Sequence, residues 1–497
     1  MKMKRSSTVS NQDRMKSMGL DEGNGGDSAQ KFHDLDEVMA SPLADWKRPW
    51  WVRTVDQPTL EVDWAGMERF DARKIQQVSW RKYIGEEKAG ELNKRREEKM
   101  RQWILDNKPG YTLRDRALDI AGSQAGSVGT SFLGSWDVTA SRTKDEGKMF
   151  TKDVTRSKLT DPARARPMSP EEMGVPRWEG IPEENSRMIR AVLRHFGADQ
   201  IGFVELNDRH RKLIYAIDAL DGKALTFENV EKAYETDKKR VIPDKARWVI
   251  VFSIQMSEEL MKRRSGLAPS AFSSSASGAA YGQARNIMDR LQNFLHILGY
   301  QGLMGTWFNG LGIAPAFGVM AGLGELSRLN RMISPEYGPL QRVFKMVTDL
   351  PLAPTKPITA GIMRFCKTCK VCAEKCPADV LSMETDPTWE PVGPWNNPGH
   401  RTWYENSTAC RTWWAISTAG CSTCFAVCPF SKKDKSFIHK IVKTTIAKNP
   451  VMTGVVNNIM TRMDGIFGYQ DQKDLEAWWG LNMPPHGVKN TKWTNLE

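Results

Sequence analysis

The stretch Cys366-Lys-Thr-Cys-Lys-Val-Cys-Ala-Glu-Lys-Cys-Pro377 decides the fold of the segment around it. Its spacing, C-x2-C-x2-C-x3-C-P, places three thiols on one short length of backbone, where they can bind one [4Fe-4S] cluster. The fourth cysteine of such a run points away and binds a second cluster. The stretch therefore predicts a module built around two iron–sulfur clusters.

A second set of cysteines also ends in a proline, Pro429. It departs from the first run, because ten residues separate Cys410 from Cys421 where two are usual. If each run lends its last cysteine to the other cluster, two sets of four ligands result. Cluster one would then be bound by Cys366, Cys369, Cys372 and Cys428, and cluster two by Cys376, Cys410, Cys421 and Cys424.

All eight cysteines lie between Cys366 and Cys428, which is unlike the distribution in a disulfide-linked secreted domain. Zinc sites and structural thiols are the alternatives. Eight cysteines in two proline-terminated sets favour a pair of clusters over both alternatives. Two adjacent clusters transfer single electrons, so another part of the chain should receive them.

The chain is long enough to receive those electrons in a core of its own. It has 497 residues, of which 40% are hydrophobic and 26% charged, so it can form a large core with an appended module. Its net charge of +12 could attract anions, anionic lipid or nucleic acid. Nucleic acid is not favoured, because the sequence contains no zinc-finger spacing or RNA-binding sheet motif. Basic and acidic residues are also mixed, as in 86–101, which is predicted to be a solvated helix face.

The segment from residue 178 to 350 has the pattern of an α/β domain. Apolar residues at helical spacing predict a helix over 183–196, which a glycine stops, and a strand follows at 201–206. A second strand is predicted over 248–254, and a second helix over 284–298.

Three other stretches bear on membranes and domain boundaries. The uncharged run 297–324 is long enough to cross a bilayer, but its glycines, with Gln301 and Pro315, favour a buried loop instead. Prolines recur in 348–359 and predict a stiff linker into the cysteine module. Residues 1–26 open with basic residues but continue without an apolar stretch, so as written they are not a working export signal.

Several motifs resemble those of the respiratory reductive dehalogenases. They are Ala321-Gly-Leu-Gly-Glu-Leu-Ser-Arg328, Ile333-Ser-Pro-Glu-Tyr-Gly-Pro339, Thr348-Asp-Leu-Pro-Leu-Ala-Pro-Thr-Lys-Pro357, Met463-Asp-Gly-Ile-Phe-Gly-Tyr469 and Trp478-Trp479. The resemblance covers residues 178–485.

The resemblance implies an α/β fold with a nitroreductase-like corrinoid-binding core. A two-cluster module like that of bacterial ferredoxins is inserted in this core or appended to it. The expected parts are a degenerate leader or flexible N-terminus, a covering region, the catalytic core, the two-cluster module and a C-terminal tail packing on the core. They correspond to residues 1–45, 46–177, 178–350, 351–435 and 436–497.

The same resemblance implies the chemistry. Family members hold a base-off cobalamin beside two [4Fe-4S] clusters and reduce its cobalt to Co(I), which attacks an organohalide at carbon or at halogen. A tyrosine donates the proton, and a nearby basic residue favours the tyrosinate. The residues that match are Tyr281 as donor, Arg342 as basic partner and Asn309 as a polar pocket residue. A half-buried tyrosine at a helix start and a surface arginine are the alternatives.

Four further residues are candidates for binding the cofactor or lining the substrate pocket. Gly322 and Gly324 lie in a loop that is glycine-rich in the family. They do not form a dinucleotide-binding motif, because Ser327 stands where the third glycine of G-x-G-x-x-G is needed. Trp307 and Trp403 could line an apolar halocarbon pocket, with core tryptophans as the alternative.

No side chain is expected to bind cobalt from below. Asp208-Arg209-His210 begins the D-x-H-x-x-G signature of such ligands, but Leu213 stands where its glycine is needed. His210 is therefore predicted to face solvent among basic neighbours.

Two other functions are also compatible with the sequence. An epoxyqueuosine reductase-like enzyme pairs the same cofactors with a tRNA substrate, which would give the positive charge a purpose. A non-catalytic two-cluster electron carrier would hold no cobalt. The proline-rich linker and the C-terminal motifs favour the dehalogenase.

Partners and location rest on the resemblance alone. The expected partners are a small halogenated organic substrate, an upstream low-potential electron donor and a small membrane-anchor protein at the outer face of the cytoplasmic membrane. Residues 7–19 keep the outline of a twin-arginine leader but lack the Arg-Arg pair, so a cytoplasmic location is the alternative.

Overall fold

The computed structural model describes residues 51–115, 169–173, 176–264, 270–305, 309–431, 473–483 and 488. The chain divides into a unit of residues 1–33, which lies outside these ranges, and a unit of residues 34–497. The helices and strands described belong to the second unit. The predicted flexible N-terminus and the motif at 463–469 lie outside the described residues.

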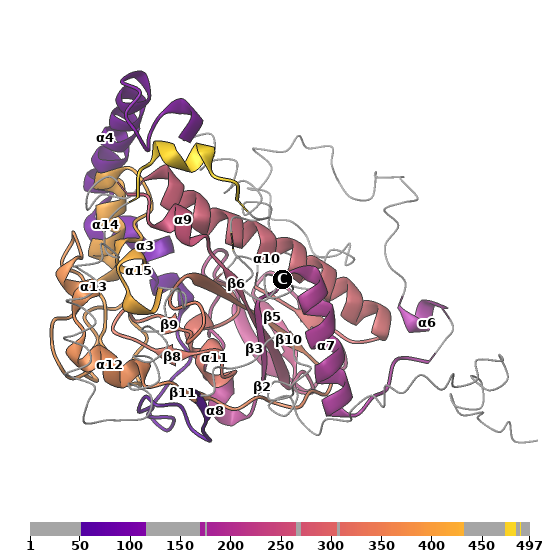
Figure 1. Ribbon diagram of the computed structural model, residues 1–497. Helices are drawn as coiled ribbons and strands as arrows, with labels where there is room; N and C mark the ends of the chain where they lie inside the picture. Colours follow the sequence, from indigo (N-terminus) through magenta and orange to yellow (C-terminus); the bar gives the residue numbers. More distant parts are fainter. Residues whose placement is uncertain are drawn as a thin grey trace, which may run out of the picture. The chain divides into compact units, whose positions relative to one another are not determined.

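A four-stranded antiparallel sheet forms the centre of the unit (Figure 1). Its strands, in spatial order, are β2 (Gln200–Glu205), β6 (Trp248–Gln255), β10 (Gln341–Thr348) and β7 (Gly302–Leu303). Successive side chains of a strand point to opposite faces, so β6 and β10 contribute to a core on each side of the sheet. The strands predicted over 201–206 and 248–254 are present, and the α/β class is confirmed.

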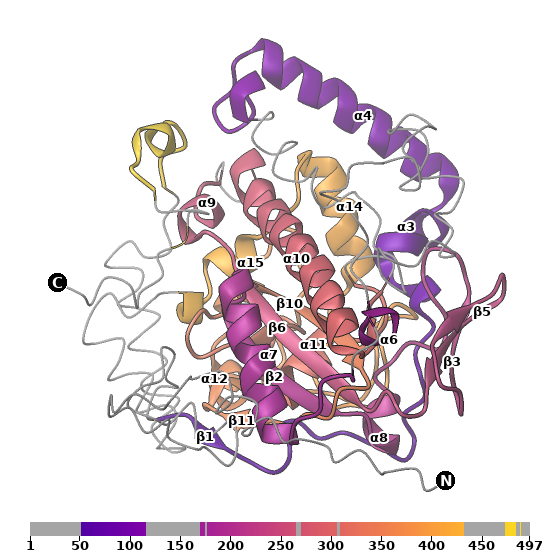
Figure 2. The ribbon, with the colours of Figure 1, turned by 90° about the vertical axis from the view of Figure 1, so that its right-hand side faces the viewer.

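Two long helices cover one face of this sheet (Figure 2). α7 (Pro182–Phe196) starts with proline in its first turn and ends at Gly197, whose φ of 103° suits glycine. α10 (Ala271–Leu298) starts with a capping box between Ser270 and Ser273. The predicted start at residue 284 is wrong, because the first half of α10 is rich in serine, alanine and glycine and shows little hydrophobic periodicity.

The second core lies on the other face of the sheet. Helix α11 (Ala314–Met320) and the hairpin of β8 (Glu325–Leu326) and β9 (Met332–Ile333) pack there. The run 297–324 thus supplies a short strand and a helix as well as buried loop. Among the helices that the structure describes, none has the length and apolarity that crossing a membrane requires.

Smaller elements surround the core. A three-stranded sheet consists of β3 (Ala224–Glu228), β5 (Lys239–Pro243) and β4 (Tyr234–Glu235), in that order. Three one-turn helices are α6 (Pro170–Met173), α8 (Asp208–Arg211) and α9 (Glu258–Met261).

The proline-rich segment before the cysteines is packed against the core along its length. The hydroxyl of Thr355 donates to the carbonyl oxygen of Ala321 at 2.7 Å and accepts from the amide of Phe203 on β2 at 2.9 Å. After it, β11 (Ile358–Thr359) pairs with β1 (Arg53–Thr54) from the N-terminal region. The predicted linker therefore attaches the cysteine module firmly to the core.

The cysteine module has a hydrophobic core of its own. Its helices are α12 (Ile362–Thr368), α13 (Val371–Glu374), α14 (Ser407–Ser417) and α15 (Thr423–Ala426), followed by the 3-10 turn η5 (Pro429–Ser431).

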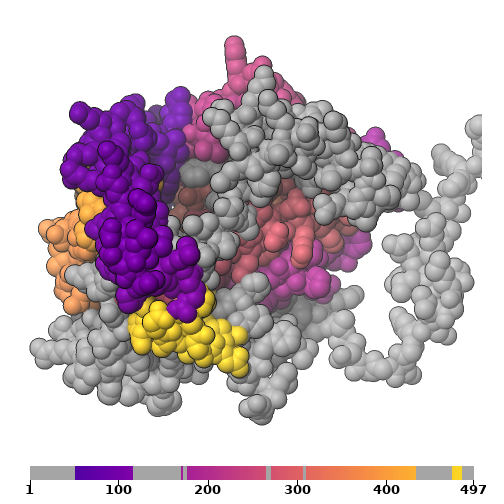
Figure 3. All heavy atoms as spheres, turned by 90° about the horizontal axis from the view of Figure 1, so that it is seen from above, coloured from indigo at the N-terminus to yellow at the C-terminus, as the bar shows by residue number. Residues whose placement is uncertain are grey.

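The N-terminal region packs on the outside of this module (Figure 3). After the 3-10 turn η1 (Ala72–Lys74), helices α3 (Gln76–Ile84) and α4 (Glu86–Leu105) lie against α14, where Trp80 donates its ring N–H to Thr412 at 2.9 Å. Ala89 is the buried residue of α4, so the predicted solvated helix is confirmed. The 3-10 turn η6 (Glu476–Gly480) adjoins this region through an ion pair of Glu476 with Arg114.

Candidate active site and cluster module

Four buried cysteines line one small void in the module. Helices α12 and α13 bring Cys366, Cys369 and Cys372 together, and Cys428 joins them from the turn before η5. Burial raises the pKa of Cys366 to about 11 and that of Cys369 to about 12, and the neighbouring thiol of Cys366 adds to the shift at Cys369. Burial keeps these groups as neutral thiols, and bound iron would stabilise their thiolate forms, so the void suits cluster one.

The other four cysteines form a second group. Burial raises the pKa values of Cys410 and Cys424, and the nearby thiol of Cys421 raises both further. Cys376 acts in the same way on Cys410 and Cys421. The structure thus brings together the set that the crossing rule assigns to cluster two.

The unusual gap before Cys421 is filled by a helix. Cys410 lies in the first turn of α14, and the residues after it complete that helix. Thr418, in the left-handed region at φ 71°, ends α14 and turns the chain back toward the module. The ten intervening residues therefore form most of α14 and a turn, and they bring Cys421 close to Cys410.

The spacing of the thiols is compatible with cubane clusters. Among the described residues, no three histidine, cysteine, aspartate or glutamate side chains lie close enough to share one ion. A cubane does not need such closeness, because each of its four thiolates binds a different iron atom.

Tyr281 and Arg342 meet at the junction of helix and sheet. The guanidinium carbon of Arg342, on β10, lies 5.3 Å from the centre of the Tyr281 ring, on α10. Arg342 also donates a hydrogen bond of 2.8 Å to the hydroxyl of Ser277, one turn before Tyr281. The edge-on ring of Phe344, 5.8 Å away between centres, fixes the other side of Tyr281.

This pair lies next to the second group of cysteines. The ring of Phe425, the residue after Cys424, lies 5.5 Å from the guanidinium carbon of Arg342. The Nε atom of Arg342 is buried and has no hydrogen-bond partner among the described residues. A tyrosine, a fixed cation and the nearer cluster site therefore share one junction.

The remaining predicted residues lie in varied surroundings. Asn309 is half-buried in the loop between β7 and α11, and the contacts that join Tyr281 to Arg342 do not involve it. Trp307 lies outside the described residues. Trp403 is 1% exposed within the core of the cysteine module, where it donates to the carbonyl oxygen of Glu384 at 3.0 Å. This is the surrounding of a core tryptophan, and its pocket role stays a prediction.

Gly322 and Gly324 both occupy positions where the backbone favours glycine. Gly322 turns the chain after α11 at φ 73°, which favours glycine. A side chain at Gly324 would collide with the carbonyl oxygen of Ile333 on the neighbouring strand. Their contact with a cofactor stays a prediction.

His210 does not face solvent, which corrects the prediction. Its Nδ1 lies 2.6 Å from the carbonyl oxygen of Glu205, and its ring packs edge-on against Trp64 with centres 5.7 Å apart. Burial lowers the pKa of His210 below its usual value, so the ring is neutral near pH 7. Sequence reasoning missed Trp64 as a cover for this histidine.

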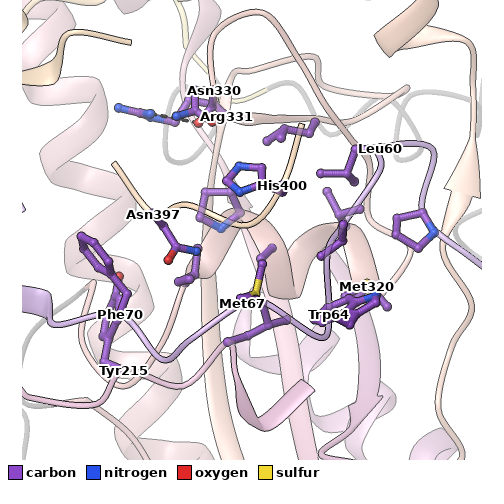
Figure 4. Close-up of a pocket in the computed structure, with 18 of the residues that line it drawn as sticks. Leu60, Trp64, Met67, Phe70, Tyr215, Met320, Asn330, Arg331, Asn397 and His400 are labelled. Carbon is purple, nitrogen blue, oxygen red and sulfur yellow. Dashed lines mark hydrogen bonds between the residues drawn. The ribbon is translucent and has the colours of Figure 1, made fainter. Parts of the chain in front are cut away.

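An apolar cavity of about 190 Å³ lies on the face of the sheet opposite α10 (Figure 4). Trp64, Met67, Phe70 and Met320 line it, and His400 approaches from the cysteine module. Burial lowers the pKa of His400 to about 4, so this ring adds no charge at neutral pH. No sequence motif indicated the cavity, because its walls come from four distant segments.

Comparisons with known proteins agree with this geometry. The family model described as reductive dehalogenase subunit matches residues 47–352. A second model, described as a 4Fe-4S double cluster binding domain, matches residues 365–431. The module therefore carries two [4Fe-4S] clusters.

Relatives with curated names match over different shares of their length. The chloroethene reductive dehalogenase of Dehalococcoides mccartyi strain VS is 30% identical over an alignment that covers 97% of this chain and 98% of that protein. A trichloroethene reductive dehalogenase from another strain of that species is 33% identical over 63% of this chain and 60% of its own. The tetrachloroethene reductive dehalogenase of Sulfurospirillum multivorans is 30% identical over 62% and 61%.

Solved structures share the fold at lower identity. The catabolic reductive dehalogenase NpRdhA superimposes with a TM-score of 0.56 at 20% identity, covering 86% of this chain and 50% of that one. Another reductive dehalogenase structure, described as suggesting a mechanism for B12-dependent dehalogenation, gives a TM-score of 0.56 at 19% identity over 88% and 55%. With a family model spanning most of its length and a relative matched nearly end to end, the chain belongs to the reductive dehalogenase family.

Proposed function

We propose that this reductive dehalogenase replaces a halogen of an organohalide with hydrogen at a corrinoid held beside Tyr281 and Arg342. The overall change consumes two electrons and one proton and releases a halide ion. Family membership favours this function over the two alternatives, an epoxyqueuosine reductase-like enzyme and a non-catalytic carrier. The observation that carries the finer proposal is the contact of Tyr281 with Arg342 next to Phe425.

The residues at this junction suit a corrinoid. The buried Nε–H group of Arg342 has no acceptor among the described residues, so it can donate a hydrogen bond to a cofactor. The side chains of Ser277 and Tyr281 are only partly buried. A solved relative is described as B12-dependent, which supports the same cofactor here. When bound, a corrinoid supplies a cobalt centre that accepts single electrons and reacts with the carbon–halogen bond.

The protein's own residues supply the proton and hold it in place. The Tyr281 hydroxyl donates the proton to the carbon that loses the halogen. The guanidinium of Arg342 stays charged throughout and stabilises the phenolate left behind. Ser277 and Phe344 fix the guanidinium and the ring, so little reorganisation is needed during transfer.

Electrons reach this junction through the two clusters. Each cluster passes one electron at a time, and the group of Cys424 lies nearer to Arg342 because Phe425 contacts both the module and the guanidinium. We propose that an upstream low-potential donor reduces the other cluster first. A small membrane-anchor protein and a location at the outer face of the cytoplasmic membrane belong to the same proposal and rest on the family resemblance.

The substitution Tyr281→Phe tests the proton donor. It removes one hydroxyl and keeps the ring against Phe344, so the fold and the clusters should survive. After anaerobic reconstitution with cobalamin, we expect halide release from chlorinated ethenes or arenes to fall by about 10²- to 10⁴-fold. Iron content and the cobalt spin signal should not change.

Tyr234→Phe is the matched control, because Tyr234 is 36% exposed on β4, in the separate three-stranded sheet. It should leave halide release unchanged. Unaltered release by Tyr281→Phe would refute the assigned donor, whereas a purified chain that takes up no corrinoid would refute the cofactor.

A further inference from the structure

Two side chains of the motif Glu325-Leu-Ser-Arg328 form hydrogen bonds with the two ends of helix α12, which carries Cys366. At the N-terminal end of α12, the carboxylate of Glu325 accepts hydrogen bonds from the amides of Ala360 and Ile362 at 2.8 and 2.9 Å. The N-cap residue, Gly361, has no side chain to satisfy these amides. Glu325, from strand β8 of the core, therefore caps a helix of the cysteine module.

Arg328 binds the opposite end of the same helix. Its Nη2 donates to the carbonyl oxygens of Cys366 and Lys367 at 2.6 and 3.2 Å, and its Nε donates to those of Cys366 and Cys369 at 3.0 and 3.2 Å. These carbonyls belong to the negative end of the helix, so a cation is favourable there. An acid at the start and a base at the end thus hold the first cluster loop to the core.

The charge of Arg328 is compensated differently from that of Arg240 and Arg263, two other buried arginines. Arg328 is 0% exposed, and the acceptors of its hydrogen bonds are all backbone carbonyls, including those of Ser382 and Glu384 at 2.6 Å. Arg240 and Arg263, which are 3% exposed, each form an ion pair with a carboxylate in contrast. A buried charge is costly without a counter-charge, and carbonyl dipoles supply only part of one.

Cluster one, when bound, would supply a counter-charge in the same small void. Arg328 lines it together with Cys366, Cys369, Cys372 and Cys428. A [4Fe-4S] cluster bound by four thiolates is an anion, and it becomes more negative by one unit on reduction. The side chain therefore sits where it can balance the cluster.

We propose that Arg328 is the counter-cation of cluster one and raises the reduction potential of that cluster. A fixed positive charge in a buried site stabilises the reduced, more negative cluster more than the oxidised one. Cluster two has basic neighbours of its own, because Arg331, paired with Glu405, lies near Cys410 and Cys424, and Arg264 lies near Cys421 and Cys424. Arg328 thereby eases the entry of an electron at the cluster remote from Tyr281.

A redox titration followed by electron paramagnetic resonance tests the proposal on the purified chain with both clusters. Arg328→Gln removes the charge and keeps some hydrogen bonds, and Arg328→Lys keeps the charge and loses most of them. We expect the Gln variant to lower one of the two midpoint potentials and leave the other unchanged. The Lys variant should keep both potentials near the wild-type values.

Arg69→Gln is the matched control. Arg69 also donates to backbone carbonyls, those of Ile214, Tyr215 and Leu225, but it lies in the core beside Phe227. Its removal should leave both midpoint potentials unchanged. A shift of the same size in this variant would show a general effect of losing an arginine that binds backbone carbonyls and would overturn the proposal.

Iron analysis separates loss of a cluster from a change in its potential, since two cubanes contain about eight irons per chain. If the Gln variant binds only half of this iron, the Lys variant decides the matter. Unchanged potentials in a fully loaded Gln variant, or a Lys variant whose potential falls as far as that of Gln, would overturn the proposal. Loss of cluster one in both variants would also overturn it, because geometry and not charge would then be the requirement.

This titration needs neither a corrinoid nor an organohalide. Its failure would leave the role of Tyr281 untouched. Conversely, a chain without corrinoid would still report the effect of Arg328, since the clusters rest on the double-cluster domain.

Discussion

Lys345 lies on β10, the strand between β6 and β7, and its amine is inside the core. It is 3% exposed and lies opposite Val251, and burial alone lowers its pKa to about 7 from the ordinary 10.5. It points away from α10, because Arg342, Phe344 and the other even-numbered residues of β10 face that helix. The buried lysine therefore lowers the stability of the fold by an amount that depends on pH. It does not contact the pair of Tyr281 and Arg342.

The substitution Lys345→Met should stabilise the protein at pH 7. The unfolded lysine keeps its proton up to about pH 10.5, whereas the folded one loses it above about pH 7, so the unfolded state binds more protons between these values. Wild-type stability relative to the Met variant should therefore rise with pH across this window. The full rise would be at most about 5 kcal/mol, at 1.36 kcal/mol for each pKa unit.

Anaerobic thermal unfolding between pH 7 and 9.5 measures this difference. Lys82→Met, on the exposed side of α3, should show no such slope. Equal pH profiles for wild type and Lys345→Met would mean that the amine has an anionic partner in the folded protein.

At the scale of elements, helix α10 shows what the sequence could and could not predict. Tyr281 is predicted as the proton donor from its order along the chain, but the helix that carries it was predicted to begin three residues after it. The Ser/Ala/Gly-rich first half of α10 is buried by packing against α9, β10 and the cysteine module, which only the folded chain defines. Ser277, which fixes Arg342, therefore stayed unrecognised.

The cysteine sets show the opposite case. Their spacing is a local property, so both sets were predictable, including Cys410 across the insertion that α14 explains. The side chains that surround them were not predictable. Arg328 and Phe425 act through contacts between segments distant in sequence, and no local pattern encodes such contacts.

The start of α10 is held by the C-terminal segment, and Trp478 tests this contact. Its ring meets Phe272 edge-on with centres 5.5 Å apart, and Lys473 pairs with Glu259 on α9 nearby. Trp478→Ala should lower the free energy of unfolding by about 2 kcal/mol and raise hydrogen exchange in the first turns of α10. Trp478→Phe keeps an aromatic ring and should lose less than half as much. Equal losses in both variants would show that packing on Phe272 does not hold the helix.

At the scale of the whole described unit, three parts are joined by contacts distant in sequence. The core and the cysteine module meet through the Glu325 and Arg328 contacts with α12. The N-terminal region spans both parts, since β1 pairs with β11 and Glu61 binds Arg401 of the module at 2.7 Å. This arrangement holds the cysteine module at a fixed place relative to Tyr281, as the proposed electron transfer over a short distance requires.

Removal of the clusters should therefore unfold the module and loosen the N-terminal region, while the central sheet survives. Four cysteines are buried in the interior of the module and three more pack against its core, so loss of iron leaves sulfur atoms without their metal partners inside the module. The sheet has separate cores on both faces, and these do not include the cysteines. Hydrogen exchange read by mass spectrometry after anaerobic iron chelation should show lost protection in α12 to α15, β1 and α3, with β6 and β10 unchanged. Reconstitution with iron and sulfide should restore the protection. If β6 and β10 lose protection at the same rate as the module, the clusters stabilise the unit as one cooperative body and the separate cores do not fold independently.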